Sequence, residues 1–88
     1  MSLSPNLSSE SDILQFVERA KTRVLDYWIG VGYVAETRGD LEVALEYYRT
    51  AVNIDRSSYV AHFNAANVLL KSGRFKQAIE SYDRALAV

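Results

Sequence analysis

One stretch of the sequence occurs twice, and this repetition constrains the fold more than any other feature. Residues Leu25 to Ile54 return, shifted by 34 positions, as Tyr59 to Val88. The identical pairs include Gly39 and Gly73, Ala44 and Ala78, Glu46 and Glu80, Tyr48 and Tyr82, and Ala51 and Ala85. Conservative pairs lie between them, such as Leu45 with Ile79 and Val52 with Leu86. Self-similarity at a fixed period of this size is typical of proteins that stack one supersecondary unit on the next.

The residues before and within the first unit show helical periodicity. Apolar residues follow one another in steps of four and three: Ile13, Val17, Ala20, Val24, Tyr27, Val31 and Val34. No strong breaker occurs before Gly39, so we favour one helix over residues 11–38. The alternative is a turn near Thr22 that separates an N-terminal helix from the first repeat.

Three further helices are predicted, over residues 41–54, 59–71 and 75–87. Gly39 can take the left-handed conformation at a helix end, and Asp40 can cap the next helix. Residues 55–58 and 72–74 read as polar turns. We therefore expect an all-α fold of two antiparallel helix pairs with an extended or additional N-terminal helix. The expected organisation is a disordered tail over residues 1–8 and one domain over 9–88, comprising an N-terminal helix at about 11–24, repeat one at 25–58 and repeat two at 59–88.

Two glycines inside the first helix need an explanation, because each costs about 1 kcal/mol relative to alanine. Gly32 indicates tight packing of a neighbouring helix. Gly30 lies on another face, where it either leaves room for a ligand or reflects simple drift, which we favour.

Composition and motifs exclude several classes of function. The net charge of −1 makes a nucleic-acid partner a poor prospect, and no apolar run is long enough to span a bilayer. Cysteine is absent and His62 is the single histidine, so no metal site is predicted. No cofactor motif or catalytic constellation is present, and we expect no enzyme activity and no cofactor. We expect a soluble, intracellular chain, in the cytoplasm.

The two units resemble tetratricopeptide repeats. In the first unit Trp28 takes the large aromatic position of that family, and the small and glycine positions hold Gly32, Gly39, Ala44 and Ala51. In the second unit the matching positions hold His62, Ala66, Gly73, Ala78 and Ala85. Two residues depart from the pattern: His62 replaces the aromatic residue, and Arg56 stands where the family usually ends a repeat with proline. His62 is interpreted as a packing residue, and the turn without proline is expected to be less rigid.

The resemblance implies a helical-repeat solenoid whose concave groove holds a protein or peptide partner. Carried over position by position, the groove residues are Ile29, Tyr33, Phe63, Asn64, Asn67 and Lys71. The apolar members would contact side chains, and the two asparagines could pair with a peptide backbone. The carboxylate clamp that some relatives use on chaperone tails is a poor match, because its lysine is replaced by Ile29 or Phe63. The function expected is therefore a non-catalytic interaction module or scaffold, with two alternatives: a substrate-recruiting region of a larger enzyme, or a homo-oligomerisation element.

The small number of repeats predicts that apolar surfaces at the ends of the array stay uncovered in a single copy. Stacked repeats bury their faces on one another, and about three are needed for stability, whereas this sequence holds two. We interpret the chain as a fragment of a longer repeat protein that self-associates, with exchange of helices between copies as one route. The residues expected to mediate this self-association are Ile13, Phe16, Val17, Val24, Tyr82 and Leu86.

Overall fold

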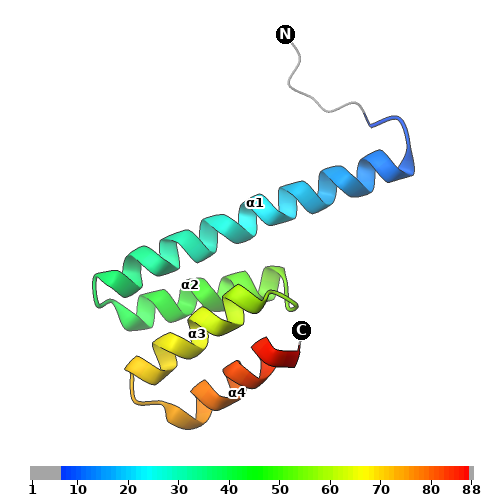
Figure 1. Ribbon diagram of the computed structural model, residues 1–88. Helices are drawn as coiled ribbons and strands as arrows, with labels where there is room; N and C mark the ends of the chain where they lie inside the picture. Colours follow the sequence, from blue (N-terminus) through cyan, green and yellow to red (C-terminus); the bar gives the residue numbers. More distant parts are fainter. Residues whose placement is uncertain (1–6, 88) are drawn as a thin grey trace.

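The computed structural model describes residues 7–87, and these residues form four helices. They are α1 (Glu10–Thr37), α2 (Leu41–Ile54), α3 (Tyr59–Lys71) and α4 (Phe75–Ala87). Successive helices run antiparallel and form two hairpins that lie side by side (Figure 1). α3 packs on α2 and also touches α1, while α4 packs on α3. The all-α helical-repeat fold predicted from the sequence is confirmed.

Helix α1 is uninterrupted over its 28 residues, as the single-helix interpretation expects. The Ser9 side chain caps its first turn by accepting a hydrogen bond from the Asp12 backbone N–H, at 3.1 Å. The tail predicted for residues 1–8 lies outside the described residues, apart from Leu7 and Ser8.

The turns follow the expected chemistry with one exception. Gly39 and Gly73 end α1 and α3 with φ angles of 82° and 75°, in the left-handed region that favours glycine. Ser58 caps α3 by accepting from the Ala61 N–H. The cap predicted for Asp40 is wrong: Asp40 precedes α2, but its side chain accepts no capping hydrogen bond.

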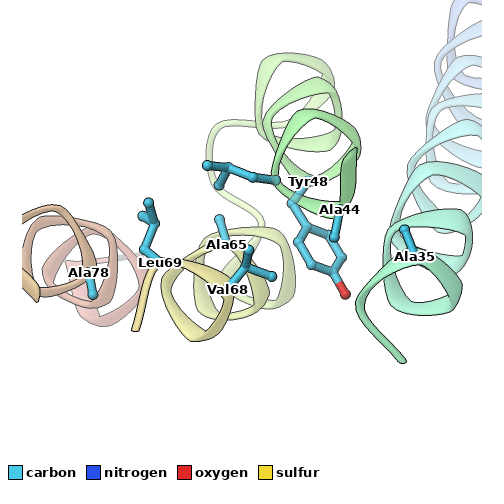
Figure 2. Close-up of a cluster of buried hydrophobic side chains, with 8 residues drawn as sticks. Ala35, Ala44, Tyr48, Ala65, Val68, Leu69 and Ala78 are labelled. Atoms are coloured by element: carbon cyan, nitrogen blue, oxygen red, sulfur yellow. The ribbon is translucent and has the colours of Figure 1, made fainter. Parts of the chain in front are cut away.

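The core lies between the helices of each pair and between α2 and α3. It is built mainly from small residues, with Tyr48, Leu45 and Val68 as its largest fully buried side chains. Figure 2 shows the Tyr48 side chain extending from α2 into the space between α1 and α3. A Cβ atom added at Gly32 would lie 2.5 Å from Cε1 of Tyr48, whereas one added at Gly30 would meet nothing within 4 Å. The tight packing predicted at Gly32 is therefore confirmed, and Gly30 opens onto free space.

α1 is twice as long as the helix it pairs with. α2 has 14 residues against the 28 of α1, and the only buried residues of α1, Gly32 and Ala35, lie in its C-terminal half. The N-terminal half extends beyond the hairpin with no other element of the described chain beside it (Figure 1). None of the four helices in residues 7–87 is long and apolar enough to cross a membrane.

The two helical glycines provide a matched test of this packing. Gly32→Ala should destabilise the fold by about 1–3 kcal/mol, because the new methyl group overlaps the Tyr48 ring. Gly30→Ala should instead stabilise it by about 0.5–1 kcal/mol, because alanine loses less backbone entropy in a helix. Urea unfolding followed by circular dichroism measures both changes. Equal effects of the two substitutions would contradict the packing described for Gly32.

Candidate partner-binding surface

Helices α1 and α3 carry the six residues predicted to line a groove, and we call this set the α1–α3 surface: Ile29, Tyr33, Phe63, Asn64, Asn67 and Lys71. The Tyr33 side chain is 60% exposed and that of Phe63 is 38% exposed. Ile29 and the two asparagines are half-buried, and Lys71 is exposed. All six are thus reachable from solvent to some degree, which a contact surface requires.

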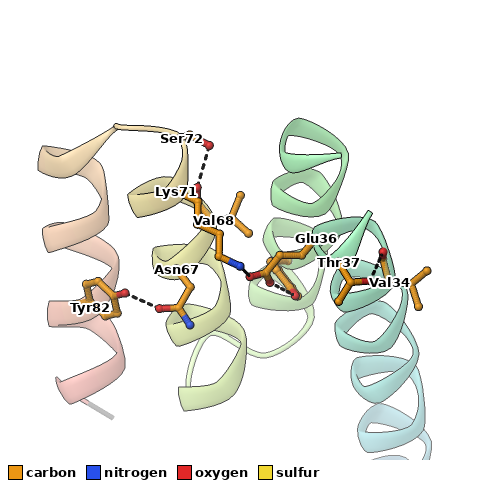
Figure 3. A network of polar contacts seen from close by, with 9 residues as sticks. Val34, Glu36, Thr37, Asn67, Val68, Lys71, Ser72 and Tyr82 are labelled. Atoms are coloured by element: carbon orange, nitrogen blue, oxygen red, sulfur yellow. Dashed lines mark hydrogen bonds and ion pairs between the residues drawn. The ribbon is translucent and has the colours of Figure 1, made fainter. Parts of the chain in front are cut away.

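A buried carboxylate joins the two helices of this surface. Glu36 of α1 has a side chain only 11% exposed, and its Oε2 accepts a hydrogen bond of 2.5 Å from the Lys71 Nζ on α3. Its other oxygen, Oε1, accepts from the Tyr48 hydroxyl at 2.8 Å. Figure 3 shows Glu36 reaching from α1 toward Lys71. Lys71 is therefore engaged within the chain, so a peptide carboxylate would have to compete with Glu36 for it.

Tyr48 is held neutral by this arrangement. Burial is the main cause that raises its pKa well above the usual range of a phenol, and the hydrogen bond to Glu36 and the negative charge of that carboxylate add to the effect. The neutral hydroxyl then remains available as the donor that one Glu36 oxygen needs.

The two asparagines differ in their bonding. The Tyr82 hydroxyl of α4 donates to Oδ1 of Asn67 at 2.5 Å, which orients the Asn67 amide (Figure 3). The Asn64 side chain forms no hydrogen bond within the part of the chain that the structure describes. Asn64 is thus the better placed of the two to pair with both the N–H and the C=O of a bound backbone.

Phe63 belongs to a row of aromatic side chains. Its ring stacks on Tyr59 with 5.6 Å between centroids, and it meets Tyr82 edge-on at 5.8 Å. Tyr59 was not among the predicted contact residues, although its spacing of four residues from Phe63 on one helix could have indicated the stack. The row continues the α1–α3 surface onto α4 and gives it a rigid apolar edge.

A separate cleft of about 370 Å³, which was not predicted from the sequence, lies between α2 and α4. Arg49 and Asn53 of α2 face Glu80 and Arg84 of α4 across it, and His62 of α3 contributes to its floor. Because α2 and α4 lie on either side of α3 and do not contact each other, this cleft is a gap in the stacking.

His62 has the structural role that the sequence predicted. It is 6% exposed, and its Nε2 lies 2.7 Å from the backbone carbonyl oxygen of Arg56. Because a carbonyl only accepts, Nε2–H must be the donor. The bond ties α3 to the turn that lacks the usual proline, so the two departures from the repeat pattern act together. In residues 7–87 no cluster of histidine, aspartate or glutamate could hold a metal ion.

Family models of known proteins match nearly all of the described chain. One model described as a tetratricopeptide repeat matches residues 10–61, and a second with the same description matches residues 36–88. The chain belongs to the tetratricopeptide repeat family. Proteins built from these repeats generally mediate protein–protein interactions, and the family is generally non-catalytic. The match to residues 10–61 includes the protruding N-terminal half of α1, which lies before the first repeat predicted from the 34-residue period.

The chain is also similar in sequence to a protein of an archaeon. An uncharacterized protein of Methanocaldococcus jannaschii is 36% identical over 63 residues, which cover 72% of this chain and 73% of the relative. No solved structure matches the chain significantly.

The role of the Tyr48 hydroxyl can be tested by pH. The pKa of Tyr48 is higher in the folded chain than in the unfolded chain. Its contribution to the free energy of unfolding is therefore fully present below about pH 10. The free energy of unfolding falls as the pH rises further, because the phenol ionises first in the unfolded state. Tyr48→Phe should therefore lower stability at neutral pH by about 1 kcal/mol and make the alkaline decline shallower. Thermal unfolding between pH 7 and pH 11 measures both effects. Tyr33→Phe, at an exposed position, is the control, and an unchanged alkaline decline in Tyr48→Phe would contradict the assignment.

The bond between His62 and the turn gives a second test. His62→Phe keeps an aromatic ring in the packing position but leaves the Arg56 carbonyl without its donor, which should cost about 1 kcal/mol of unfolding free energy. Arg56→Ala keeps the carbonyl and should be nearly neutral. Urea unfolding distinguishes the two, and equal losses would show that the Arg56 side chain, and not its carbonyl, holds the turn.

Proposed function

We propose that this chain is a protein-interaction module that binds a peptide or a helix of another protein along the α1–α3 surface. The observation that carries this proposal is the combination of exposed aromatic side chains with an asparagine whose amide has no partner in the described chain. Tyr33 and Phe63 offer apolar contact area at low entropic cost, because each side chain has few rotatable bonds and Phe63 is already fixed by stacking. Hydrogen bonds from Asn64 to a peptide backbone would then set the direction of the bound segment.

The electrostatics of the surface favour a partner without a strong charge. Its lysine is neutralised by Glu36, and its remaining members are uncharged side chains. Affinity must therefore come from apolar burial and backbone hydrogen bonding. We propose that the partner segment carries apolar anchor residues, spaced to reach Tyr33 on one helix and Phe63 on the other.

The proposal is tested with peptides enriched from a displayed random library by selection on this protein. Phe63→Ala combined with Asn64→Ala should weaken binding of the enriched peptides at least tenfold, equivalent to about 1.4 kcal/mol, because it removes the fixed ring and the amide. Fluorescence anisotropy measures the affinities, and circular dichroism verifies that helicity is retained. The control is Asn53→Ala combined with Gln77→Ala, in the cleft between α2 and α4. Binding that resists the first change but is lost in the control would locate the site in the cleft and disprove the proposal.

A second proposed function is self-association, which specific observations favour. The six residues expected to mediate it lie on α1 and α4, and four of them leave about half of their side-chain surface to solvent: Ile13, Phe16, Val17 and Val24 are 45–49% exposed. Leu86 of α4 is 78% exposed, and Tyr82 is half-buried. Exposed apolar residues arranged in rows indicate surfaces that another protein surface covers.

A further inference from the structure

The two repeats can be compared position by position, and α4 is far more exposed than its counterpart α2. Leu45 of α2 is 2% exposed, whereas the equivalent Ile79 of α4 is 61% exposed. Val52 is half-buried, whereas the equivalent Leu86 is 78% exposed. The reason is that α3 covers this side of α2, while no element of the described chain covers the same side of α4. We call this row on α4 the open face: Phe75, Ile79, Tyr82 and Leu86.

The internal contact between α3 and α2 shows what kind of surface fits such a face. Ala61, Ala65 and Val68 of α3 are 0%, 5% and 0% exposed, and Ala65 and Val68 belong to the same buried cluster as Leu45 and Tyr48 of α2. The three α3 residues follow one another in steps of four and three residues and so form one stripe along the helix. A helix that covers the open face must present a similar stripe of small and medium-sized apolar residues.

The N-terminal half of α1 presents such a stripe. Ile13, Val17, Ala20 and, just past the midpoint of the helix, Val24 follow in steps of four, three and four, the same steps that separate the four residues of the open face. Ile13, Val17 and Val24 are 47%, 49% and 47% exposed. Both rows thus extend over three helical turns, so their ridges have matching lengths.

The same half of α1 also lacks support in the single chain. It extends from the hairpin without a neighbour in the described structure (Figure 1). A helical segment of about 14 residues is only marginally stable in water without tertiary packing. A surface that covers its apolar stripe would supply that packing.

We propose that the N-terminal half of α1 in one copy packs on the open face of α4 in a second copy, head to tail. The inference specifies the geometry of the proposed self-association and does not depend on peptide binding by the α1–α3 surface. The contact is heterologous, since it joins two different surfaces. A pair of copies joined in this way retains one unused stripe, on one copy, and one unused open face, on the other, so further copies add until a ring closes or an open chain forms.

Head-to-tail contact predicts a specific response to blocking either surface. Val17→Glu places a charge in the α1 stripe, and Ile79→Glu places one in the open face. Sedimentation of the unmodified protein across micromolar concentrations should show species heavier than the 9.9 kDa monomer. Each single variant alone should be monomeric, because every contact would then include one blocked surface.

Mixing the two variants should restore association, but only to a dimer. The Ile79→Glu copy supplies an intact stripe and the Val17→Glu copy supplies an intact open face, and the two remaining surfaces are blocked. Gln15→Glu and Gln77→Glu are the matched controls: each adds a carboxylate two residues away, on another side of the same helix, and should leave assembly unchanged. Circular dichroism of each variant verifies that the α2–α3 core remains folded.

Every other outcome overturns the inference. A monomeric unmodified protein disproves self-association altogether and indicates that the open face is covered by a different chain segment or partner. Association of the Ile79→Glu variant by itself would show that α1 pairs with α1 in a symmetric dimer. Failure of the mixture to dimerise would show that the stripe and the open face do not contact each other. Peptide binding to the Phe63 and Asn64 variant is measured separately, so either proposal can fail without the other.

Discussion

Gly32 on α1 lies directly against the ring of Tyr48 on α2, and the rest of the structure depends on this contact. Only a residue without a side chain permits the ring to lie so close to the α1 backbone. With its ring in this position, the Tyr48 hydroxyl donates a hydrogen bond to Glu36 of α1. Glu36 also accepts a hydrogen bond from Lys71 of the second repeat. One aromatic side chain therefore sets the spacing within the first hairpin and helps to align the second hairpin on it. Removal of the glycine would disturb both relationships, since the ring has little room to move in a close-packed core.

The equivalent tyrosine of the second repeat has a different environment, and this difference separates the roles of the two repeats. Tyr82 donates a hydrogen bond to Asn67 of its own hairpin and packs on Phe63. Tyr48, in contrast, donates to the mostly buried carboxylate of Glu36 and is covered by α3. The first repeat is consequently the more buried element, built around small residues and a tyrosine that bonds a mostly buried carboxylate. The second presents aromatic rings and amide groups at its surface, so it has the greater capacity to contact a partner.

Much of the architecture could be predicted from sequence because it depends on local or repeated features. The 34-residue period, the helical stripes and the turn glycines are properties of neighbouring residues, and they gave the four helices and the family. The packing role of Gly32 followed from the energetic cost of glycine in a helix. The cap expected at Asp40 failed because the same residue type can precede a helix with its side chain directed elsewhere, and only the backbone geometry at that position decides the matter. The Tyr59–Phe63 stack was missed although it joins residues four positions apart on one helix. The cleft between α2 and α4 was missed because it depends on how whole helices lie beside one another.

The sequence by itself determined that this chain folds as stacked helix pairs, that glycines end its first and third helices, and that His62 fills a packing position. It could do so because helix periodicity, left-handed turns and repeat identity are recorded in residues close together or at a constant offset. The tertiary structure decided which groups are free to act. It paired Lys71 with Glu36 across 35 residues, left Asn64 without a partner in the described chain, and exposed Ile79 while burying the equivalent Leu45. These outcomes depend on which helix lies against which, so two similar apolar residues in equivalent positions of the repeats have two different environments.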